Sequence, residues 1–513
     1  MTVLAAGVLP QHQTTSSTCV PAPSSVHYRL AATVDVIAGE EGGGMLFSAR
    51  PLKALRLNAS GIGLVAGLSG SEGRTLAEMA ACVPELSPLA AAGFLEALER
   101  RRLLVRQPVM PVAWPPVSII VAAHGRPAAT RACVQSLLSL DYPRERIEIM
   151  VVDDASDPPL AGALTGLPVR LLRLEHNIGQ SAARNLAAAE ADGALLAFTD
   201  NDCVADAGWL RDLVPYFGDP DIAIVGGRVI APPPTGAVTS AVAAFEAVRS
   251  PLGMGPAGGP VGPREAVAYL PSCNLVVRRD VFLACGGFAA DMRLGEDVDL
   301  AWRVLRCRAR VHYAAAGTIT HDHRARLGAL LRRRAEYGSS EADLQDRHPG
   351  NGRIMHLPRA GLLMLAALAA FPLAWPAAAV MIALAAGMAA IEGIKKRRRL
   401  RRIGLAVTAR RLAASIIREH GASLYHLGHD VTRYYGLPLA ALGVLWTPLL
   451  PVAAVMMLVP PVCDHRRLKP PLSLAAFIGL YWLEMGAYQL GVWRGCLVRR
   501  CYRPLLPLIR WRG

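Results

Sequence analysis

Between residues 117 and 350, short runs of β-branched and aliphatic residues alternate with longer stretches whose apolar residues recur at helical spacing. The runs predict strands, and the spaced stretches predict helices. The predicted strands are 117–123, 147–153, 169–174 and 194–200, and the predicted helices are 127–140 and 180–191. Such alternation is typical of a mostly parallel sheet, in which ligands bind at the carboxyl ends of the strands. We therefore expect the chemistry where these strands end.

Residues 28–106 show a different pattern, in which strand-like segments come before helix-like ones. The expected strands are 28–37, 45–47 and 54–58, and the expected helices are 59–68, 75–82 and 89–101. This order predicts a small α/β domain. Residues 107–116 contain four prolines, which favour extended backbone and indicate a linker. Residues 1–27 are rich in Ser, Thr and Pro and show no hydrophobic period, so we expect a flexible leader. Residues 1–10 lack the charged start and apolar core of a secretory signal.

Three long apolar runs lie within residues 351–513, and each is long enough to cross a bilayer: 360–391, 434–463 and 470–493. Each run has Lys or Arg on both flanks, whereas a simple crossing should have them only on its cytoplasmic flank. Prolines interrupt the first two runs and favour segments that fold back: Pro372, Pro376, Pro448 and Pro451. Arginines between these runs favour an amphipathic surface helix: Arg410, Arg411 and Arg418. We expect a membrane-associated helical region with re-entrant or monotopic segments, and the alternative is a set of buried helices in a soluble domain.

The composition supports a membrane contribution. Of the 513 residues, 52% are hydrophobic and only 19% are charged, and the mean hydropathy is +0.31. The formal net charge is +15, and residues 392–513 hold 20 Lys/Arg against 5 Asp/Glu, so the excess is C-terminal. Basic charge in an apolar region indicates an anionic membrane surface as a partner rather than nucleic acid, for which no motif is present. We expect the protein at the cytoplasmic face of the cell membrane.

Acidic pairs follow two of the predicted strands. Asp153 and Asp154 end the second strand, where a carboxylate can accept hydrogen bonds from a base or a ribose hydroxyl. A turn capped by these side chains is the alternative. Asp200 and Asp202 follow the strand that begins at 194, and two carboxylates at this spacing suit a hard divalent cation that also binds phosphate oxygens. We expect Mg²⁺ or Mn²⁺ as the cofactor.

Three other segments carry candidate side chains. Glu296 and Asp297 open an amphipathic helix, so Asp297 could act as a general base or could only cap the helix. In the segment H-D-H, His321 or His323 could complete a metal shell, and a surface loop is the alternative. Arg184 lies near the start of a predicted helix, where it and the helix amides could face an anion.

Together, these motifs resemble those of the family 2 glycosyltransferases. V-S-I-I-V-A, V-V-D-D-A-S, G-Q-S-A-A-R-N, T-D-N-D and G-E-D-V-D-L occur in that family's order and spacing, over about residues 117–345. The resemblance implies a GT-A fold and inverting transfer from a nucleotide-sugar. It implies Asp297 as the catalytic base, with Glu296 beside it, and a metal held by Asp202, Asp200 and, we expect, His323. The residues expected to bind the nucleotide-sugar are Ala122, Asp153, Asp154, Arg184, Asn185, Asp200 and Arg303.

The segment R-R-R-A-E-Y-G at 332–338 occupies the place where processive members of that family carry Q-x-x-R-W. Its Gln and Trp are missing here. The absence of this Gln and Trp argues against processive polymerisation of long chains.

The small N-terminal domain resembles the PqqD-like peptide-recognition modules. The resemblance lies in L-N-A-S at 57–60, T-L-A-E at 75–78 and F-L-E-A-L-E-R-R-R-L-L at 94–104. It implies that residues 28–106 hold a ribosomal precursor peptide by strand addition. A winged-helix or packing domain is the alternative.

The whole arrangement, with this module before a family 2 transferase and a hydrophobic tail, resembles the glycosyltransferases of mycofactocin systems. That resemblance implies a peptide-derived redox cofactor as acceptor and β-linked glucose units from UDP-glucose. One rival is a membrane glycosyltransferase that acts on a lipid or cell-envelope glycan. The other is an inactive peptide-binding scaffold, and the intact Asp154, Asp202 and Asp297 argue against it.

Overall fold

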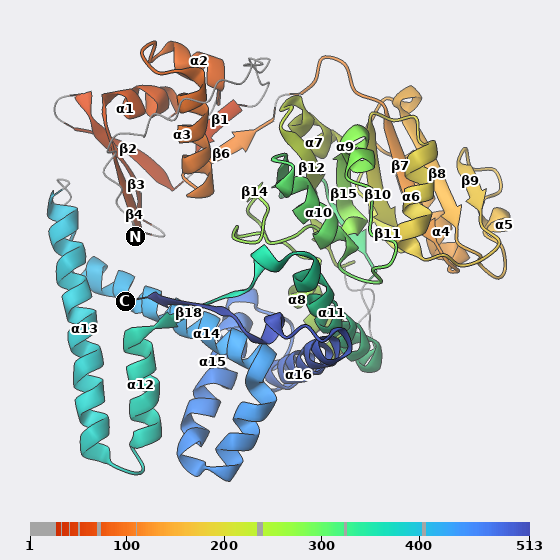
Figure 1. Ribbon diagram of the computed structural model, residues 1–513. Helices are drawn as coiled ribbons and strands as arrows, with labels where there is room; N and C mark the ends of the chain where they lie inside the picture. The colour runs from red at the N-terminus through yellow and green to blue at the C-terminus, as the bar shows by residue number, and fades with distance from the viewer. Residues whose placement is uncertain are drawn as a thin grey trace. The chain divides into compact units, whose positions relative to one another are not determined.

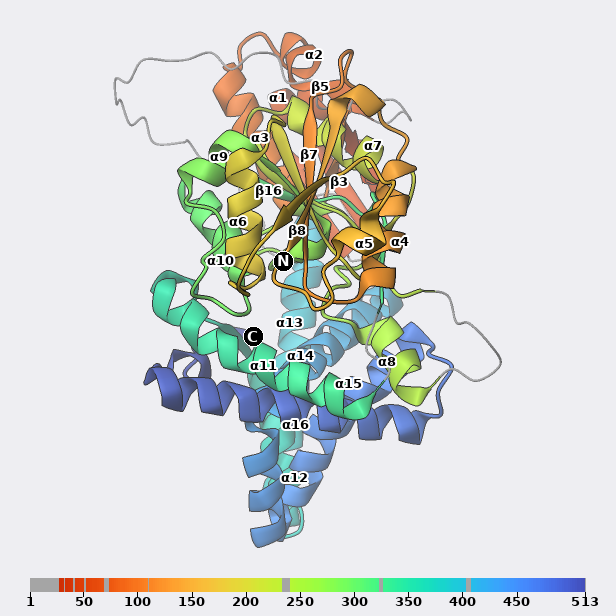
Figure 2. The same ribbon diagram turned by 90° about the vertical axis from the view of Figure 1, so that its right-hand side faces the viewer.

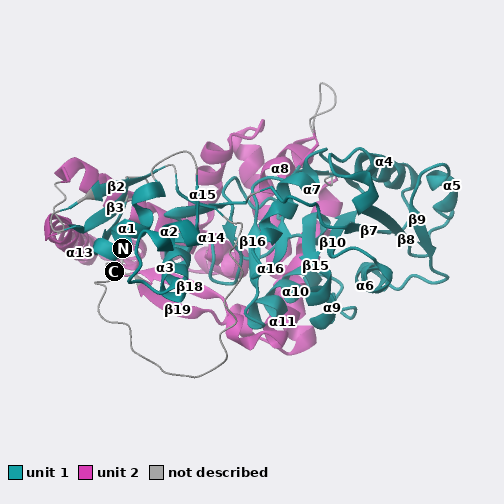
Figure 3. Cartoon of the chain, turned by 90° about the horizontal axis from the view of Figure 1, so that it is seen from above, with its two compact units in different colours: residues 1–230, 251–322 teal, residues 231–250, 323–513 magenta. Residues whose placement is uncertain are grey.

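The computed structural model has two compact units (Figure 3). The first comprises residues 1–230 and 251–322, and the second comprises 231–250 and 323–513. The residues that the structure describes are 27–31, 33–39, 42–49, 52–68, 73–108, 110–232, 240–322, 326–402 and 407–512. Nearly all of the expected leader lies outside these ranges. An inserted segment, 231–250, leaves the chain of the first unit and belongs to the second.

The first unit is built around an eight-stranded sheet (Figure 1). Its strands, in spatial order, are β14 (Gly259–Pro260), β16 (Arg310–Tyr313), β12 (Ile222–Gly226), β15 (Leu275–Arg278), β10 (Leu195–Asp200), β7 (Val117–Ala123), β8 (Ile147–Asp153) and β9 (Arg170–Arg173). Strands β10, β7, β8 and β9 are parallel, as are β12 and β16. Strand β15 runs antiparallel between β10 and β12. The expected mostly parallel sheet is therefore confirmed.

Helices cover both faces of this sheet because side chains alternate along buried strands. On β7, Ile119 and Val121 join one core and Ile120 joins the other. The first core includes side chains of α4 (Pro127–Leu138) and α7 (Trp209–Leu213). The second includes side chains of α6 (Gln180–Glu190), α9 (Arg279–Ala284) and α10 (Glu296–Arg306). A small sheet of β11 (Cys203–Ala205), β17 (Ile319–His321) and β13 (Val229–Ile230) lies beyond the end of β10.

The N-terminal part of the first unit contains two three-stranded sheets. One has the order β5 (Arg74–Thr75), β1 (His27–Leu30), β6 (Leu104–Gln107), and the other has the order β2 (Val34–Ala38), β3 (Gly44–Ala49), β4 (Leu52–Leu57). The single strand expected at 28–37 is therefore wrong. The Val34 amide donates to the Ala31 carbonyl oxygen at 2.8 Å, and this turn sends β1 and β2 into different sheets.

The three helices of this part begin at side-chain caps. They are α1 (Ala59–Val65), α2 (Leu76–Ala81) and α3 (Pro88–Arg100), and their N-caps are Asn58, Thr75 and Ser87. Thr75 and Glu78 form a reciprocal capping box. The sequence predicted the three helices to within two or three residues, although 66–68 is a 3₁₀ turn rather than part of α1.

The second unit is mainly helical (Figure 2). It contains α8 (Ala241–Arg249), α11 (Leu327–Arg347), α12 (Arg359–Ala370), α13 (Trp375–Arg402), α14 (Ala409–Leu445), α15 (Leu450–Leu468) and α16 (Leu474–Arg499), together with β18 (Ile354–Pro358) and β19 (Leu508–Arg512). Helices α11 and α16 lie side by side, with Gly491 and Gly495 against the backbone of Ala335 and Ser339. A Cβ at Gly491 would lie 2.0 Å from the Ala335 carbonyl oxygen, so only glycine allows this approach.

The first two apolar runs fold back at their prolines, as expected. Pro372 lies in the turn between α12 and α13, and Pro448 lies in the turn between α14 and α15. Pro376 and Pro451 lie in the first turns of the helices that follow, where a missing N–H costs little. Within the described ranges, two helical segments could cross a membrane by length and composition: Trp375–Arg402 and Thr447–Leu468.

Candidate active site

The candidate site lies where β7, β8 and β10 end. Asp200, at the end of β10, is in register with Ala122 of β7, and Ala123 is in register with Asp153 at the end of β8. Parallel strands in register end along one edge of the sheet, so these side chains share that edge.

Asp153 and Asp154 shape the loops at this edge. Asp153 is fully buried and accepts hydrogen bonds from the amides of Ser156 and Leu160, each at 2.9 Å. Burial raises the pKa of Asp153, but the hydrogen bonds and the Arg173 guanidinium together lower it by more. The pKa of Asp153 is therefore below its usual value. The pair therefore includes at least one carboxylate with a clear structural function.

Asp154 holds the start of α6. Its two carboxylate oxygens accept the amides of Ile178 at 2.8 Å and Gly179 at 3.0 Å. Gly179 has a φ of +85°, a conformation that favours glycine and that turns the chain into α6. The G-Q-S-A-A-R-N segment thus begins on the Asp154 carboxylate.

Arg184 is the charged centre of the site. Its side chain is fully buried and forms ion pairs with Asp200 and with Glu296, the latter with its closest N and O atoms 3.4 Å apart. Its guanidinium also donates to Ser272 Oγ at 3.1 Å and lies 5.5 Å from the centre of the Phe288 ring. The structure thus places Arg184 between two carboxylates that are 96 positions apart in the sequence.

Asn185 and Arg303 both contact the loop that follows α9. The Asn185 side chain donates to the Phe288 carbonyl oxygen at 2.7 Å and accepts the Phe288 amide at 2.9 Å. Arg303 pairs with Asp299 and donates to the Gly287 carbonyl oxygen at 2.6 Å. Both residues therefore fix the backbone of 287–288 in this structure.

Asp297 lies at the start of α10, beside the Arg184 pair. Its carboxylate accepts the amides of Val298 at 2.8 Å and Ser272 at 3.1 Å. Burial, and then the negative charge of Glu296, raise the pKa of Asp297 to about 7. Glu296 itself accepts a hydrogen bond from Gln180 Nε2 at 2.7 Å and pairs with Arg184. A carboxyl group with this pKa can take up a proton near neutral pH.

A candidate metal site forms around Asp202. Strand β11 pairs with β17 so that Cys203 is opposite His321, and the His321 Nε2 lies 3.5 Å from an Asp202 carboxylate oxygen. Ligand atoms of Asp202, Cys203 and His321 all lie within 4.8 Å of one another. The other Asp202 oxygen accepts Arg126 Nη1 at 2.7 Å.

These donors fit a divalent cation of the expected kind. A carboxylate and an imidazole suit Mn²⁺, and the carboxylate alone suits Mg²⁺, whereas the thiol of Cys203 suits neither. Burial raises the pKa of Asp202, which a bound cation would reverse. Of the two histidines considered, His321 faces Asp202, and His323 lies outside the described residues.

Several contributors to the site carried no sequence signal. Gln180, Ser272 and Arg126 contact Glu296, Asp297 and Asp202. Ser272 and Arg126 stand in no pattern typical of a functional residue, and Gln180 lies within G-Q-S-A-A-R-N without being one of that motif's expected binding residues. The approach of His321 depends on β11 and β17, which are too short to predict from the sequence.

Comparison with known proteins matches the part of the chain that forms most of this sheet. The profile of the family described as "Glycosyl transferase family 2" matches residues 118–282. Residues 118–282 are a family 2 glycosyltransferase domain. The transferase domain has the GT-A-like fold that the sequence predicted, with its central, mostly parallel sheet.

Individual relatives extend the similarity over more of the chain. A "Pre-mycofactocin glycosyltransferase" of Mycobacterium tuberculosis is 29% identical over 409 residues, which cover 77% of this chain and 82% of that protein. The "O-antigen biosynthesis protein RfbC" of Myxococcus xanthus is 32% identical over 252 residues, 46% of this chain and 20% of that protein. Among solved structures, a mannosyltransferase from Pyrobaculum calidifontis in complex with GDP-Man and Mn²⁺ aligns with a TM-score of 0.37 and 19% identity, covering 68% of this chain and 88% of that chain.

Proposed function

We propose that this glycosyltransferase moves a sugar from a nucleotide-sugar to mycofactocin or its precursor, with inversion at the anomeric carbon. The proposed donor is UDP-glucose, and the proposed product is a β-linked glucoside. The observation that carries the proposal is the Asp297 carboxylate, which has a pKa of about 7 at the edge of the transferase sheet. The similarity to the mycobacterial relative over 77% of the chain supports the choice of acceptor.

Asp297 is the proposed base. Its carboxylate accepts the proton of the acceptor hydroxyl while the hydroxyl oxygen bonds to the anomeric carbon and the bond to the diphosphate breaks on the opposite face. The Ser272 and Val298 amides orient the carboxylate. Arg184 pairs with Glu296, so Asp297 is the carboxylate of the two that is left to accept the proton.

Donor binding is proposed at the ends of β7, β8 and β10. Ala122, Asp153 and Asp154 would line the nucleotide side, with Arg184, Asn185, Asp200 and Arg303 as the other donor-site residues. A divalent metal would be held by Asp202 and His321, with Asp200 near it, and would offset negative charge on the diphosphate leaving group. The role of His323 as a ligand stays a prediction.

The acceptor is proposed to be bound in part by residues 28–106. The sheet of β2, β3 and β4 has two edge strands, β2 and β4, to which a peptide could add by backbone hydrogen bonds. Within the first unit, Arg106 of β6 makes buried ion pairs with Glu99 of α3 and with Asp219 of the transferase domain. Arg310 of β16 also pairs with Glu99 at 2.7 Å. These charges would hold the proposed peptide module on the transferase domain.

We place the reaction at the cytoplasmic face of the cell membrane. The two apolar helical segments and the basic C-terminal region support this placement. The same features would suit a transferase that glycosylates a lipid or envelope glycan, so the test must include that acceptor class.

Nucleotide release by the purified full chain in detergent tests the proposal. The donor is UDP-glucose with Mg²⁺ or Mn²⁺, and the acceptors are mature mycofactocin, its precursor, or a polyprenyl phosphate. We expect release to be stimulated by the mycofactocin acceptors and to fall by about 10²–10⁴-fold in Asp297→Asn. Release that is stimulated only by the polyprenyl phosphate would replace the proposed acceptor with a lipid.

Asp280→Asn is the matched control for the base. Asp280 also lies in the first turn of a helix, α9, and accepts the next amide, that of Val281, at 2.8 Å. It is exposed, whereas Asp297 lies beside the buried Arg184 pair. If both variants lose activity equally, Asp297 acts only as a helix cap and the proposed mechanism is wrong.

A further inference from the structure

The second unit carries two helical hairpins whose tips are exposed and apolar. Helices α12 and α13 form one hairpin, and α14 and α15 form the other. Helix α12 packs against α15 and against the 3₁₀ turn 447–449, so the hairpins lie together, and both tips point the same way (Figures 1 and 2). Phe371 and Trp375 at one tip are 64% and 68% exposed, and Leu445 and Trp446 at the other are 82% and 51% exposed.

Each hairpin is free of charge over a limited length. Residues 360–391 and 434–463 contain no Asp, Glu, Lys or Arg. At about 1.5 Å per helical residue, α12 extends about 18 Å from its tip to Arg359, and α14 extends about 18 Å from its tip back to Arg433. Helix α15 extends about 21 Å from its tip to Asp464, and α13 extends about 26 Å to Glu392.

One arm of each hairpin is too short for a crossing, namely α12 and the part of α14 beyond Arg433, although α13 and the segment 447–468 are long enough by themselves. The hydrocarbon core of a bilayer is about 30 Å thick, so a hairpin that crossed it would bring Arg359, Arg433 and Asp464 into hydrocarbon. Asp464 is 1% exposed and paired with Arg249. This ion pair holds Asp464 within a buried charged cluster of the second unit, so Asp464 cannot move into the membrane with the tip. An insertion of about 18 Å instead keeps all of these charges at or above the surface.

The surroundings of the hairpins favour an anionic lipid surface as the occupant. Seven exposed basic residues lie at the far end of α13 and the start of α14, about 30 Å or more from the tips, so after insertion they attract an anionic surface at longer range and do not contact headgroups: Lys395, Arg397, Arg398, Arg401, Arg402, Arg410 and Arg411. At the base of the first hairpin, Arg359 on α12 is exposed, whereas Arg433 at the base of the second pairs with Glu341. Exposed large apolar side chains on a surface with this charge match a membrane interior below anionic headgroups.

We propose that both hairpin tips insert into the membrane from one side and end inside the hydrocarbon, so that both ends of each hairpin stay on the same side. The tips penetrate past the middle of the bilayer without reaching the opposite headgroups. This inference goes beyond the proposed reaction and does not depend on the identity of the acceptor.

Depth-dependent quenching tests the insertion on the unmodified chain. The full chain is transferred from detergent into vesicles of phosphatidylcholine with phosphatidylserine, in which the acyl chains are brominated at a shallow or a deep position. We expect deep bromines to quench part of the tryptophan fluorescence, and we expect Trp375→Phe with Trp446→Phe to lose that part. Equal quenching in this double variant and in the unmodified chain would overturn the proposal.

Sidedness is tested with single cysteines at the tips, Leu373→Cys or Leu445→Cys, in a chain whose other cysteines are replaced by serine. A membrane-impermeant maleimide should label neither tip from either side of sealed vesicles and should label both in detergent. Labelling from the side opposite to the rest of the chain would show that the hairpins cross. Labelling from the same side would show that they do not insert.

A charge at each tip should weaken binding. For Phe371→Glu with Leu445→Glu, we expect at least a tenfold loss of vesicle-bound protein in 1 M salt. The matched control is Leu89→Glu with Val112→Glu, two exposed apolar residues of the first unit that are 85% and 108% exposed. An equal loss in both double variants would show a general effect of added charge and would contradict insertion by the tips.

Discussion

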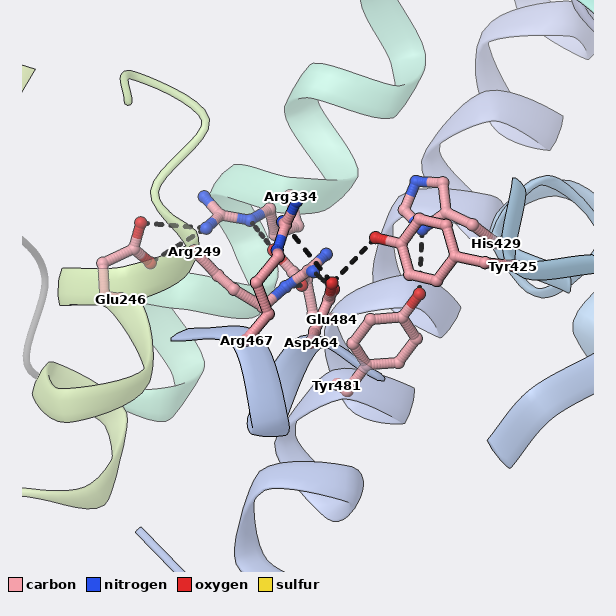
Figure 4. Close-up of polar contacts among 9 residues, drawn as sticks. All are labelled: Glu246, Arg249, Arg334, Tyr425, His429, Asp464, Arg467, Tyr481 and Glu484. Atoms are coloured by element: carbon pink, nitrogen blue, oxygen red, sulfur yellow. Dashed lines mark hydrogen bonds and ion pairs between the residues drawn. The ribbon is translucent and has the colours of Figure 1, made fainter. Parts of the chain in front are cut away.

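Two buried arginines, one in each unit, stand in the same arrangement but have different consequences. In the transferase domain, Arg184 lies between Asp200 and Glu296. In the second unit, Arg334 of α11 lies between Glu246 of α8 and Glu484 of α16, at 2.9 and 2.7 Å. Figure 4 shows this second cluster, which also includes Arg249, Asp464 and Tyr425.

The difference lies in the carboxylate that has no arginine bonded to it. Around Arg334, the buried acids of α8, α15 and α16 each pair with Arg334 or Arg249. Burial raises the pKa of Glu484, but Arg249 and Arg334 lower it more, so its charge is stabilised. Around Arg184, Asp297 lies next to a paired Glu296, and the hydrogen bonds it accepts from the described residues come from backbone amides. Its pKa rises to about 7. Full pairing gives a structural cluster, and the one acid left without an arginine is the proposed base.

The comparison also explains the R-R-R-A-E-Y-G segment. Its third arginine is Arg334, which is buried and engaged by two glutamates. Arg333 lies over the Tyr337 ring at 4.9 Å and pairs with Glu336. In this structure, the segment therefore links helices of the second unit.

The largest expected effect follows from removing the arginine of the structural cluster. Arg334→Met leaves Glu246 without its ion-pair partner in a buried site, and we expect a loss of about 3–5 kcal/mol of unfolding free energy. Thermal and denaturant unfolding in detergent measure it. Since the ion pairs of Arg334 are with Glu246 and Glu484 of the second unit, kcat per folded molecule should not change.

A neutral cluster is the control for that variant. The triple variant combines Arg334→Met with Glu246→Gln and Glu484→Gln, which removes the unpaired charge. It should recover most of the unfolding free energy that Arg334→Met alone loses. If Arg334→Met instead lowers kcat and leaves stability unchanged, the cluster is part of the catalytic machinery and the contrast between the two arginines fails.

The next largest effect concerns the metal. His321→Ala removes the imidazole that faces Asp202, and we expect Mn²⁺ to bind at least about tenfold more weakly, since even indirect partners of a metal site change affinity by 10–100-fold. Electron paramagnetic resonance titration of free Mn²⁺ measures this without donor or acceptor. The exposed His176→Ala is the matched control. Unchanged affinity would remove His321 from the proposed ligand set.

The sequence predicted the strands of the site better than its contacts. The limits of 147–153 agree with β8, and 180–191 agrees with α6 to one residue, because periodicity is a local property. The pairing of Arg184 with Glu296 joins helices α6 and α10, which only the folded sheet brings together. The same is true of His321, which reaches Asp202 through two three-residue strands.

The candidate acids were found for a related reason. The strands can be recognised in the sequence, so the residues at their ends can be recognised as well. Their individual roles were not, since Asp153 and Asp154 look alike in V-V-D-D-A-S. The structure distinguishes them, with Asp153 holding its own loop and Asp154 holding the start of α6.

A smaller effect should appear in the pH dependence. A base must be deprotonated, so kcat/KM should rise with pH and level off above about 7, the pKa of Asp297. Glu296→Gln removes the negative charge that raises this pKa, so the rise should move to lower pH. Glu175→Gln, an exposed acid of the first unit, should leave the profile unchanged. A shift to higher pH would contradict the assigned cause.

Ionisation of Asp297, which activity requires, should lower the free energy of unfolding. Because the pKa of Asp297 is raised on folding from an ordinary value near 4, its ionisation disfavours the folded state, and this penalty grows as pH rises from about 4 to about 7. Asp297→Asn should therefore be more stable than the unmodified chain above pH 7 and similar to it near pH 4. Unfolding at both pH values measures this, and a variant that is less stable at high pH would contradict the raised pKa.

The smallest effect is expected at the rim of the structural cluster. Arg467 is 71% exposed and lies 3.6 Å from Asp464, which keeps Arg249 and Tyr425 as partners. An exposed ion pair contributes about 0.2–1 kcal/mol and is screened by salt, so Arg467→Ala should lose no more than that, and less in high salt. The exposed Arg466→Ala is the control, and unfolding at low and high salt is the measurement. A loss of several kcal/mol would mean that Arg249 and Arg334 alone do not balance the three buried acids of the cluster. Complete pairing by these two arginines would then not explain the difference between the cluster and the site around Asp297.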